Sequence, residues 1–532
     1  MLAKAPSAVL RASRPALRRQ HLQPRRYEST GKGRLTPWKT DSAEPPSVLV
    51  EDSVSRYTTF TLDFFYRFVK FTAIGLVTVG TTVGTGFAAA HMWVENAALA
   101  PEQDEEVRKW EWDLEAERSS GGAQGGTDPG LGFKGRVAVR AAWMAQNWGP
   151  GTTTSVIGSK AYSGRVRPES GTLSAVPAEL EYAQDFLSIA IHAAMENPKK
   201  VRPETVTELT VWHANIMERM GTKEGVFEAR DEFERVWASL PGKGIDAARV
   251  ASKLGDLNQR LDDPEDALAW WARSIQLVQD KARPEAAAAV PVVPDSAPSS
   301  PLAQRTLAST LVSLSVFYAT SGQLEQARSL EQSSLDLLRS IKQPESFESA
   351  SRPRALHALY LLHRSALLSV HLAEVEHVLR AKQEVPLQWL TRAAESSERV
   401  ALALSGLPII HPDAPESKIP HPPSSDTPLV PDYAKSTSMS RPAKSLLRDS
   451  RRTAAEAWNL MGILIEGTRA AGASEKALEC YERALGWAGV AADRAGGIGK
   501  ASEGTLETEW KALWANYVRV RDAVRQQQEK KK

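Results

Sequence analysis

The chain has 532 residues but only one cysteine, Cys480, which excludes an intramolecular disulfide framework. It also lacks the GxSxG, HExxH and CxxC motifs of nucleophilic, metal-dependent and redox sites. A GxGxxG match, GLGFKG at 130–135, has no strand pattern before it and no acidic residue about 20 positions after it. Four histidines fall on one predicted helix, where only pairs 14 residues and about 21 Å apart share a face: His357, His363, His371 and His377. We therefore expect no catalytic residue, no cofactor and no metal, and hence no enzyme.

Ionisable side chains are absent from Phe71 to Ala90, although 24% of the chain is Asp, Glu, Lys or Arg. Twenty residues of helix span about 30 Å, the thickness of a bilayer core. The glycines and threonines of this stretch would make a poor helix in water, whereas membrane helices tolerate them. We predict a transmembrane helix region at 64–94, in which Gly80 and Gly84 form a small-residue face for contact with another helix.

Acidic residues are also absent from the N-terminus until Glu28, while positive charges are frequent there. The basic residues before it are Lys4, Arg11, Arg14, Arg18, Arg19, Arg25 and Arg26. An Arg-rich, acid-poor segment without a long apolar run is typical of a mitochondrial transit peptide, which we place at 1–27. A basic arm that binds nucleic acid is the alternative. Removing these seven charges from the formal net charge of +2 leaves about −5, however, so we expect no nucleic-acid partner.

A matrix-directed presequence followed by a hydrophobic stop predicts a single-pass protein of the mitochondrial inner membrane. The short arm at 28–63 would then stay in the matrix, and everything after the span would lie in the intermembrane space. The juxtamembrane segment at 95–177 is rich in Trp and Gly and has little helical periodicity. Its tryptophans are typical of a membrane surface, or of docking onto a helical repeat or a membrane partner.

From 178 to 532 the chain is rich in Ala, Leu, Glu and Arg with helical periodicity, which predicts an all-α fold. Three stretches share the small and aromatic spacing of a tetratricopeptide solenoid. Small residues in this pattern let the two helices of a repeat approach closely. The residues expected at these contacts are Leu254, Gly255, Ala267, Trp271, Tyr318, Ala327, Trp458, Gly462, Ala477 and Tyr481.

Two Pro-rich insertions are expected within the repeats, near 281–302 and 411–449. Once they are removed, the remaining spacing leaves room for two degenerate helix pairs between 351 and 407. The first helix of each repeat would line a groove suited to an extended polypeptide. By register, the groove residues are Arg249, Ser252, Asp256, Gln259, Ser309, Val312, Val316, Glu456, Asn459 and Ile463. Their mixed polarity favours broad binding over one strict motif.

The segments HMWVE, WEWDLE, GGTDPGLGFKGR and RAAWMAQNWG, followed by degenerate repeats, resemble a family of fungal proteins. These are the inner-membrane adaptor subunits of the mitochondrial i-AAA protease supercomplex. The resemblance implies a protein that binds the i-AAA protease and a sister membrane adaptor subunit, and that delivers unfolded membrane and intermembrane-space proteins for degradation. A tetratricopeptide scaffold or assembly factor for inner-membrane complexes is the alternative.

Overall fold

The computed structural model describes residues 51–149, 155–157, 175–279, 291–407, 428–468, 470–490 and 510–531. The expected transit peptide, most of the matrix arm and the first parts of both expected insertions (281–290 and 411–427) lie outside these residues. The chain divides into two compact units, residues 1–82 and 83–532, which are described separately.

Helix α1 (Glu51–Trp93) contains 43 residues and continues into one π-helical turn, η1 (Val94–Ala98). The helical stretch from Phe60 to Ala98 includes most of α1 and all of η1. Among the described residues, it is the one helix long and apolar enough to cross a membrane. The threonines fit this helix because their hydroxyls donate to the carbonyl four residues earlier, as Thr78 does to Ile74 over 2.8 Å. The helix is longer than the 64–94 region that the sequence predicts.

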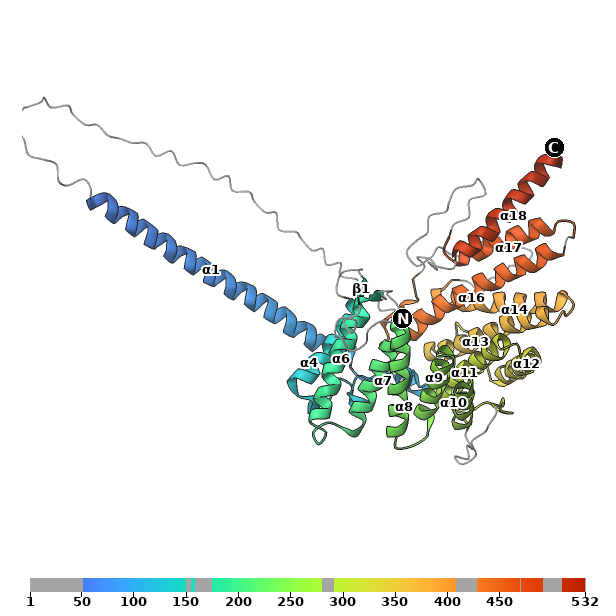
Figure 1. Ribbon diagram of the computed structural model, residues 1–532, viewed down its shortest axis with the longest axis horizontal. Coiled ribbons are helices and arrows are strands. Elements are labelled where there is room, and N and C mark those ends of the chain that lie inside the picture. The colour runs from blue at the N-terminus through green and yellow to red at the C-terminus, as the bar shows by residue number, and fades with distance from the viewer. Residues whose placement is uncertain are drawn as a thin grey trace, which may run out of the picture. The chain divides into compact units, whose positions relative to one another are not determined.

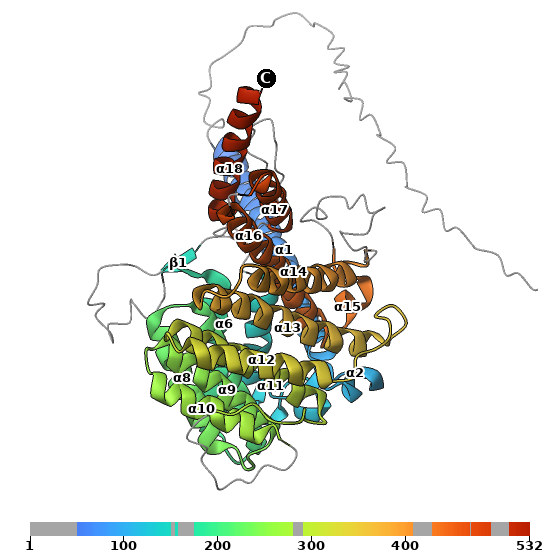
Figure 2. The same ribbon diagram turned by 90° about the vertical axis from the view of Figure 1, so that its right-hand side faces the viewer.

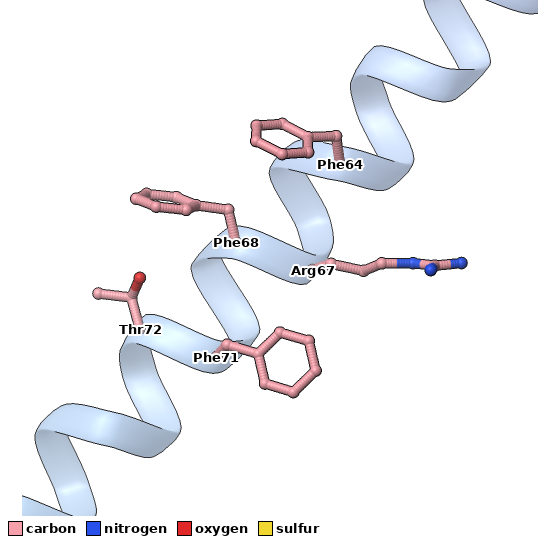
Figure 3. A pocket seen from close by; sticks show the side chains of 5 residues that line it. All are labelled: Phe64, Arg67, Phe68, Phe71 and Thr72. Atoms are coloured by element: carbon pink, nitrogen blue, oxygen red, sulfur yellow. The ribbon is translucent and has the colours of Figure 1, made fainter. Parts of the chain in front are cut away.

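Figure 3 shows part of α1 in the first unit, where Phe64, Phe68 and Phe71 project from the helix beside Arg67 and Thr72. The rings of Phe64 and Phe68 stack with their centroids 6.4 Å apart, and both are more than half exposed. The shallow hollow between such side chains is open and belongs to a single helix. A Cβ added to Gly80 or Gly84 would meet nothing within 4 Å, so none of the described residues packs against this small-residue face.

The second unit is built from helices that pack in consecutive pairs (Figures 1 and 2). The predicted all-α class is therefore confirmed. The pairs are α4 (Gly132–Trp148) with α6 (Ala178–Glu196), α7 (Pro203–Met220) with α8 (Lys223–Ser239), α9 (Ile245–Arg260) with α10 (Pro264–Leu277), α11 (Pro301–Thr320) with α12 (Leu324–Ser340), α13 (Arg352–Val378) with α14 (Glu384–Ser405), and α16 (Ser440–Gly467) with α17 (Ala473–Trp487). Helix α18 (Trp510–Lys531) packs on α17.

The shorter elements lie mainly in the juxtamembrane segment. They are α2 (Glu105–Lys109), α3 (Trp112–Glu115), η2 (Gly122–Gln124), η3 (Pro129–Leu131) and α15 (Pro431–Lys435). An antiparallel ribbon joins β1 (Ser155–Ile157) to β2 (Ala175–Pro177), with Val156 opposite Val176. The described part of the juxtamembrane segment is therefore structured, and its α4 forms a pair with α6, the first helix after residue 177.

Close contacts between small and aromatic residues hold two of the pairs together. A Cβ at Gly255 of α9 would lie 2.4 Å from the Trp271 ring of α10, and one at Gly462 of α16 would lie 2.7 Å from the Tyr481 ring of α17. Only glycine allows the two backbones to approach to this distance. The turn between α9 and α10 is fixed by Asp263, whose side chain caps α10 one residue before Pro264.

The number of repeats between 351 and 407 differs from the expectation. One pair, α13 and α14, occupies this region instead of two, because α13 alone is 27 residues long. The second insertion is also shorter than expected, since α16 begins at Ser440 and buries Ala443 and Leu446. Helices α13 and α16 are both longer than half of a tetratricopeptide repeat, which contains two helices in about 34 residues. Spacing arithmetic that assumes a constant repeat therefore overestimates the number of pairs.

Candidate functional site

Residues 102–117 of the juxtamembrane segment, which we call the clasp, contact helices that are more than 100 residues away in sequence. The clasp follows η1, contains α2 and α3, and carries glutamates at many positions. It crosses the N-terminal parts of α9, α11, α13 and α16, the first helices of their pairs. Helix N-termini carry partial positive charge, so an acidic segment is favoured at this edge.

Trp112 anchors the clasp in the interior. Its side chain is 0% exposed, and its indole Nε1 donates to the backbone carbonyl of Pro353 over 3.0 Å. The guanidinium carbon of Arg305 lies 3.9 Å from the ring centroid, a cation–π contact in a desolvated setting. Val107 and Tyr433 of α15 belong to the same buried cluster, so the clasp shares a core with the helices that it crosses.

Arg305 of α11 is the polar centre of the site and is only 1% exposed. Its Nε donates to Glu115 Oε2 over 2.5 Å, and its terminal nitrogens donate to the backbone carbonyls of Trp110 (3.1 Å) and Glu111 (3.0 Å). A buried guanidinium is tolerated only when its donors are satisfied and its charge is paired. The clasp supplies both, because these three acceptors all belong to it.

His357 of α13 completes the surroundings of Arg305. Burial and the nearby Arg305 charge lower the pKa of His357 to about 3, so the imidazole is neutral at physiological pH. Arg305 Nη1 donates to His357 Nδ1 over 3.2 Å, which leaves the proton on Nε2 for donation to Gln304 Oε1 over 2.9 Å. The neutral ring therefore links clasp, α11 and α13 without adding a second buried charge.

Glu111 caps helix α11 from outside that helix. Its Oε2 accepts hydrogen bonds from the backbone N–H of Leu302 (2.7 Å) and from the Ser300 hydroxyl (2.6 Å). Glu111 adopts φ 55°, a left-handed conformation that costs free energy for a residue with a Cβ. The contacts of its carboxylate with the helix N-terminus offset this strain.

The remaining clasp contacts extend along the same edge. Arg249 of α9 donates to the carbonyls of Leu114 (2.8 Å) and Glu115 (3.3 Å), and Arg441 of α16 forms an ion pair with Glu117. Two serine hydroxyls before α13 and α16 donate to clasp glutamates: Ser351 to Glu106 over 3.1 Å, and Ser438 to Glu102 over 2.8 Å. The clasp thus joins four helix pairs by their N-terminal edges.

The expected groove residues differ in how far they are engaged inside the chain. Hydrogen bonds hold five of them: Arg249 binds the clasp, Ser252 bonds Thr310 (2.9 Å), Asp256 accepts from Trp271 (3.0 Å), Ser309 bonds Tyr360 (2.6 Å) and Asn459 bonds Asn516 of α18 (3.0 Å). Burial raises the pKa of the Asp256 carboxyl. Val312 packs beside a buried cluster, and Glu456 is exposed.

The positions still accessible to a partner lie near the other end of the first helices. Gln259 and Val316 are partly exposed near the C-termini of α9 and α11, and Ile463 is 43% exposed near the C-terminus of α16. Of the expected groove residues, the three with accessible side chains near the C-terminal ends of these helices remain candidates for contact with a partner. Nothing in the spacing of the repeats indicated that the N-terminal edge would be covered by residues 102–117.

The expected packing residues all lie at helix contacts. Most are buried, and the exception is Trp458, which is partly buried and donates to Glu398 over 2.7 Å. The buried members are Leu254, Gly255, Ala267, Trp271, Tyr318, Ala327, Gly462, Ala477 and Tyr481. The small members lie where neighbouring helices touch, so their role is structural.

The GLGFKG segment serves a close backbone approach. A Cβ at Gly130 would lie 2.1 Å from the carbonyl oxygen of Lys200. Asp128 beside it accepts hydrogen bonds from the N–H groups of Gly130 and Arg202, each over 2.8 Å, and from the Thr205 hydroxyl. These contacts depress the pKa of the Asp128 carboxyl against the opposing effect of burial. They tie the segment to the start of α7.

One side-chain arrangement resembles a catalytic triad. Ser188 of α6 lies 3.3 Å from His213 Nε2, and His213 Nδ1 lies 2.7 Å from Glu232 Oε2. Ser188, however, lies in the middle of α6, where the backbone N–H groups are engaged in helical hydrogen bonds and are not free to stabilise an oxyanion. Among the described residues, no cluster of His, Cys, Asp and Glu is placed to hold a metal ion.

Comparison with known proteins gives no assignment: no protein-family model matches the chain, and a search of curated proteins finds no significant match. The structure itself defines an all-α protein of pairwise-packed helices with one long apolar helix ahead of them.

Proposed function

We propose that this chain is a single-pass tetratricopeptide adaptor of the i-AAA protease in the mitochondrial inner membrane. Its N-terminus faces the matrix and its repeats face the intermembrane space. It binds the protease and a sister adaptor subunit, and it delivers unfolded proteins for degradation. The family resemblance, the apolar helix and the glycine–aromatic contacts of consecutive helix pairs support this proposal.

The clasp is the observation that carries the proposal. It begins at Glu102, shortly after α1 ends at Trp93. It contacts four helix pairs, and Trp112 and Arg305 are its buried anchors. A short, structured connection holds the repeats near the site where a membrane-embedded protease works. Tethering of this kind raises the effective concentration of a captured substrate without any catalytic group.

The accessible C-terminal edge of α9, α11 and α16 is the proposed substrate surface. It combines an amide, Gln259, with two apolar side chains, Val316 and Ile463. A mixed surface of this kind binds many extended sequences weakly, which suits an adaptor with many substrates.

The test replaces these three residues together in the full-length protein: Gln259→Ala, Val316→Ser and Ile463→Ser. A matched control replaces exposed residues of the second helices: Gln326→Ala, Gln332→Ala and Glu479→Ala. We expect the edge variant to lose co-precipitation of unfolded substrates and to slow their turnover in a pulse-chase, while the i-AAA protease still co-precipitates with it. The control should behave as wild type.

Two outcomes would contradict the proposal. Normal turnover of i-AAA substrates in cells without the protein would favour the scaffold alternative, as would co-precipitation of a stoichiometric complex that lacks the protease. Protection of the repeats from protease in mitoplasts would place them in the matrix and contradict the proposed topology.

A further inference from the structure

Exposed aromatic and apolar side chains lie at the end of the apolar helix and at both ends of α4. We call Met92, Trp93, Phe133 and Trp148 the exit patch. Phe133 is 81% exposed, Met92 63%, and the two tryptophans 50% each. The rings of Trp93 and Trp148 have centroids 5.7 Å apart, and Trp143 lies 5.8 Å from Trp93 and 5.7 Å from Trp148. Phe133 is the most exposed large apolar side chain among the described residues.

Helix α4 has two distinct faces. One face buries Gly135, Ala138, Val139 and Ala142, mostly in the cluster shared with α6. By helical periodicity, Phe133 lies on the opposite face together with Arg136 and Arg140. Phe133 is therefore exposed because α4 packs against α6 with its opposite face.

The end of the apolar helix is attached to this outer face of α4. Glu95 pairs with Arg136 (2.9 Å) and with Arg140 (3.4 Å), and it also accepts from the N–H (3.0 Å) and the hydroxyl (2.9 Å) of Thr127. Trp93, two residues earlier, contacts the rings at the C-terminal end of α4. The residues on both sides of this junction belong to the second unit, so the arrangement is internal to it.

The surface that fits the exit patch is a lipid bilayer. Trp93 is the last residue of α1, so a helix that crosses a membrane places Trp93 and the adjoining Trp148 within a few ångströms of the point where it leaves the hydrocarbon. Phe133 lies at the other end of α4, about 22 Å away along its axis, and reaches the same surface if α4 lies along the membrane. Tryptophan is favoured at this depth, where its ring meets both apolar chains and head groups. Lys134, exposed beside Phe133, adds a positive charge suited to lipid phosphates.

We propose that helix α4 lies in the membrane interface, with Phe133 and Trp148 inserted among the lipid head groups. This second contact, besides the span, fixes the helical pairs against the bilayer. The proposal rests on the membrane anchoring described under the proposed function, and it is independent of the protease partner.

The test uses single cysteines labelled with an environment-sensitive fluorophore in the full-length protein. The native Cys480 is buried, and burial raises the pKa of its thiol to about 12, so it stays unlabelled. Phe133→Cys reports on the patch. The matched control is Phe227→Cys on α8, another phenylalanine that is 50% exposed. Val79→Cys, in the apolar helix, reports on insertion of the span.

The proteins are reconstituted into phosphatidylcholine vesicles that carry a spin-labelled lipid, either near the head group or near the chain end. We expect the head-group label to quench emission at position 133 several-fold more than at position 227, and the chain-end label to quench most strongly at position 79. Strong quenching at 79 with equal, weak quenching at 133 and 227 would overturn the proposal and leave the span intact.

Two further outcomes would also overturn it. Weak quenching at position 79 as well would refute both the span and the interfacial helix. Emission at position 133 that changes only when membrane proteins are present would show that a protein, not lipid, covers the patch. Co-precipitation of the protease is measured separately, so failure here is distinguishable from failure of the adaptor function.

Discussion

The two ends of helices α9, α11 and α16 are treated in opposite ways. At their N-terminal ends, the acidic clasp engages Arg249, Arg305 and Arg441 and buries Trp112 completely. At their C-terminal ends, Gln259, Val316 and Ile463 remain accessible. The helix dipole explains part of this asymmetry, because carboxylates are stabilised only at N-termini. The N-terminal edge of these helices is therefore covered by the clasp, whereas side chains at the C-terminal edge are partly exposed.

The largest expected effect comes from removing the anchor of the clasp. Trp112→Ala should lower the free energy of unfolding by about 4 kcal/mol, because it leaves a large cavity and removes the aromatic face over Arg305. Denaturant unfolding of the full-length protein in detergent micelles measures this. The matched control, Trp148→Ala, removes a half-exposed ring and should cost less than about 1 kcal/mol. Equal losses in the two variants would mean that the clasp is not part of the core.

A smaller loss of stability is expected from a substitution at the contact between α9 and α10, away from the clasp. Gly255→Ala should cost about 2 kcal/mol, since the added methyl would overlap the Trp271 ring and force α9 and α10 apart. Gly242→Ala is the control, because a Cβ there meets nothing within 4 Å. Identical thermal unfolding of both variants would show that the α9–α10 contact is looser than described.

His357, beside Arg305 at the N-terminal edge, should make the stability of the protein depend on pH. Its folded pKa of about 3 lies below the ordinary value of 6.5, so between these values the unfolded state binds more protons. The stabilisation is complete above pH 6.5 and is lost as the pH falls toward 3. Between pH 7 and pH 5, the free energy of unfolding should therefore fall less in His357→Gln than in the wild type, by on the order of 1–2 kcal/mol. His363 and His371, whose pKa values are also lowered, to about 3 and 4, contribute to the loss of stability in acid with the same sign.

The smallest effect on stability is expected at the C-terminal edge. Replacing Gln259, Val316 and Ile463 together should change the free energy of unfolding by less than about 1 kcal/mol, because partly exposed side chains contribute little packing. A cooperative loss of stability in this variant would show that the edge is buried by the chain itself. It would then be a poor candidate for a binding surface.

The sequence predicts the features that depend on local patterns. The all-α class and the apolar helix follow from periodicity and hydropathy within single helices, and the Gly255–Trp271 contact follows from a spacing of 16 residues. The number of helix pairs could not be predicted, because α13 and α16 are longer than the single helices of a standard repeat. Spacing arithmetic has no means to detect such lengthening.

The clasp could not be predicted for a different reason. Trp112 meets Pro353, 241 residues away in sequence, and Glu115 meets Arg305, 190 residues away. Helical periodicity identifies which face of a helix is apolar, but it does not show which distant segment covers the end of that helix. The one usable signal was the alternation of tryptophan and acid in WEWDLE, a composition suited to a surface with both buried pockets and helix N-termini.

Hydrogen exchange over residues 102–117 tests the central claim most directly. In the full-length protein, the account predicts slow amide exchange in the clasp, comparable to that of α11, because Trp112 and the partners of Arg305 are buried in one core. Arg305→Met should accelerate exchange in the clasp while α17 stays protected. Exchange in the wild-type clasp as fast as in an unstructured peptide, and unchanged in Arg305→Met, would contradict the account.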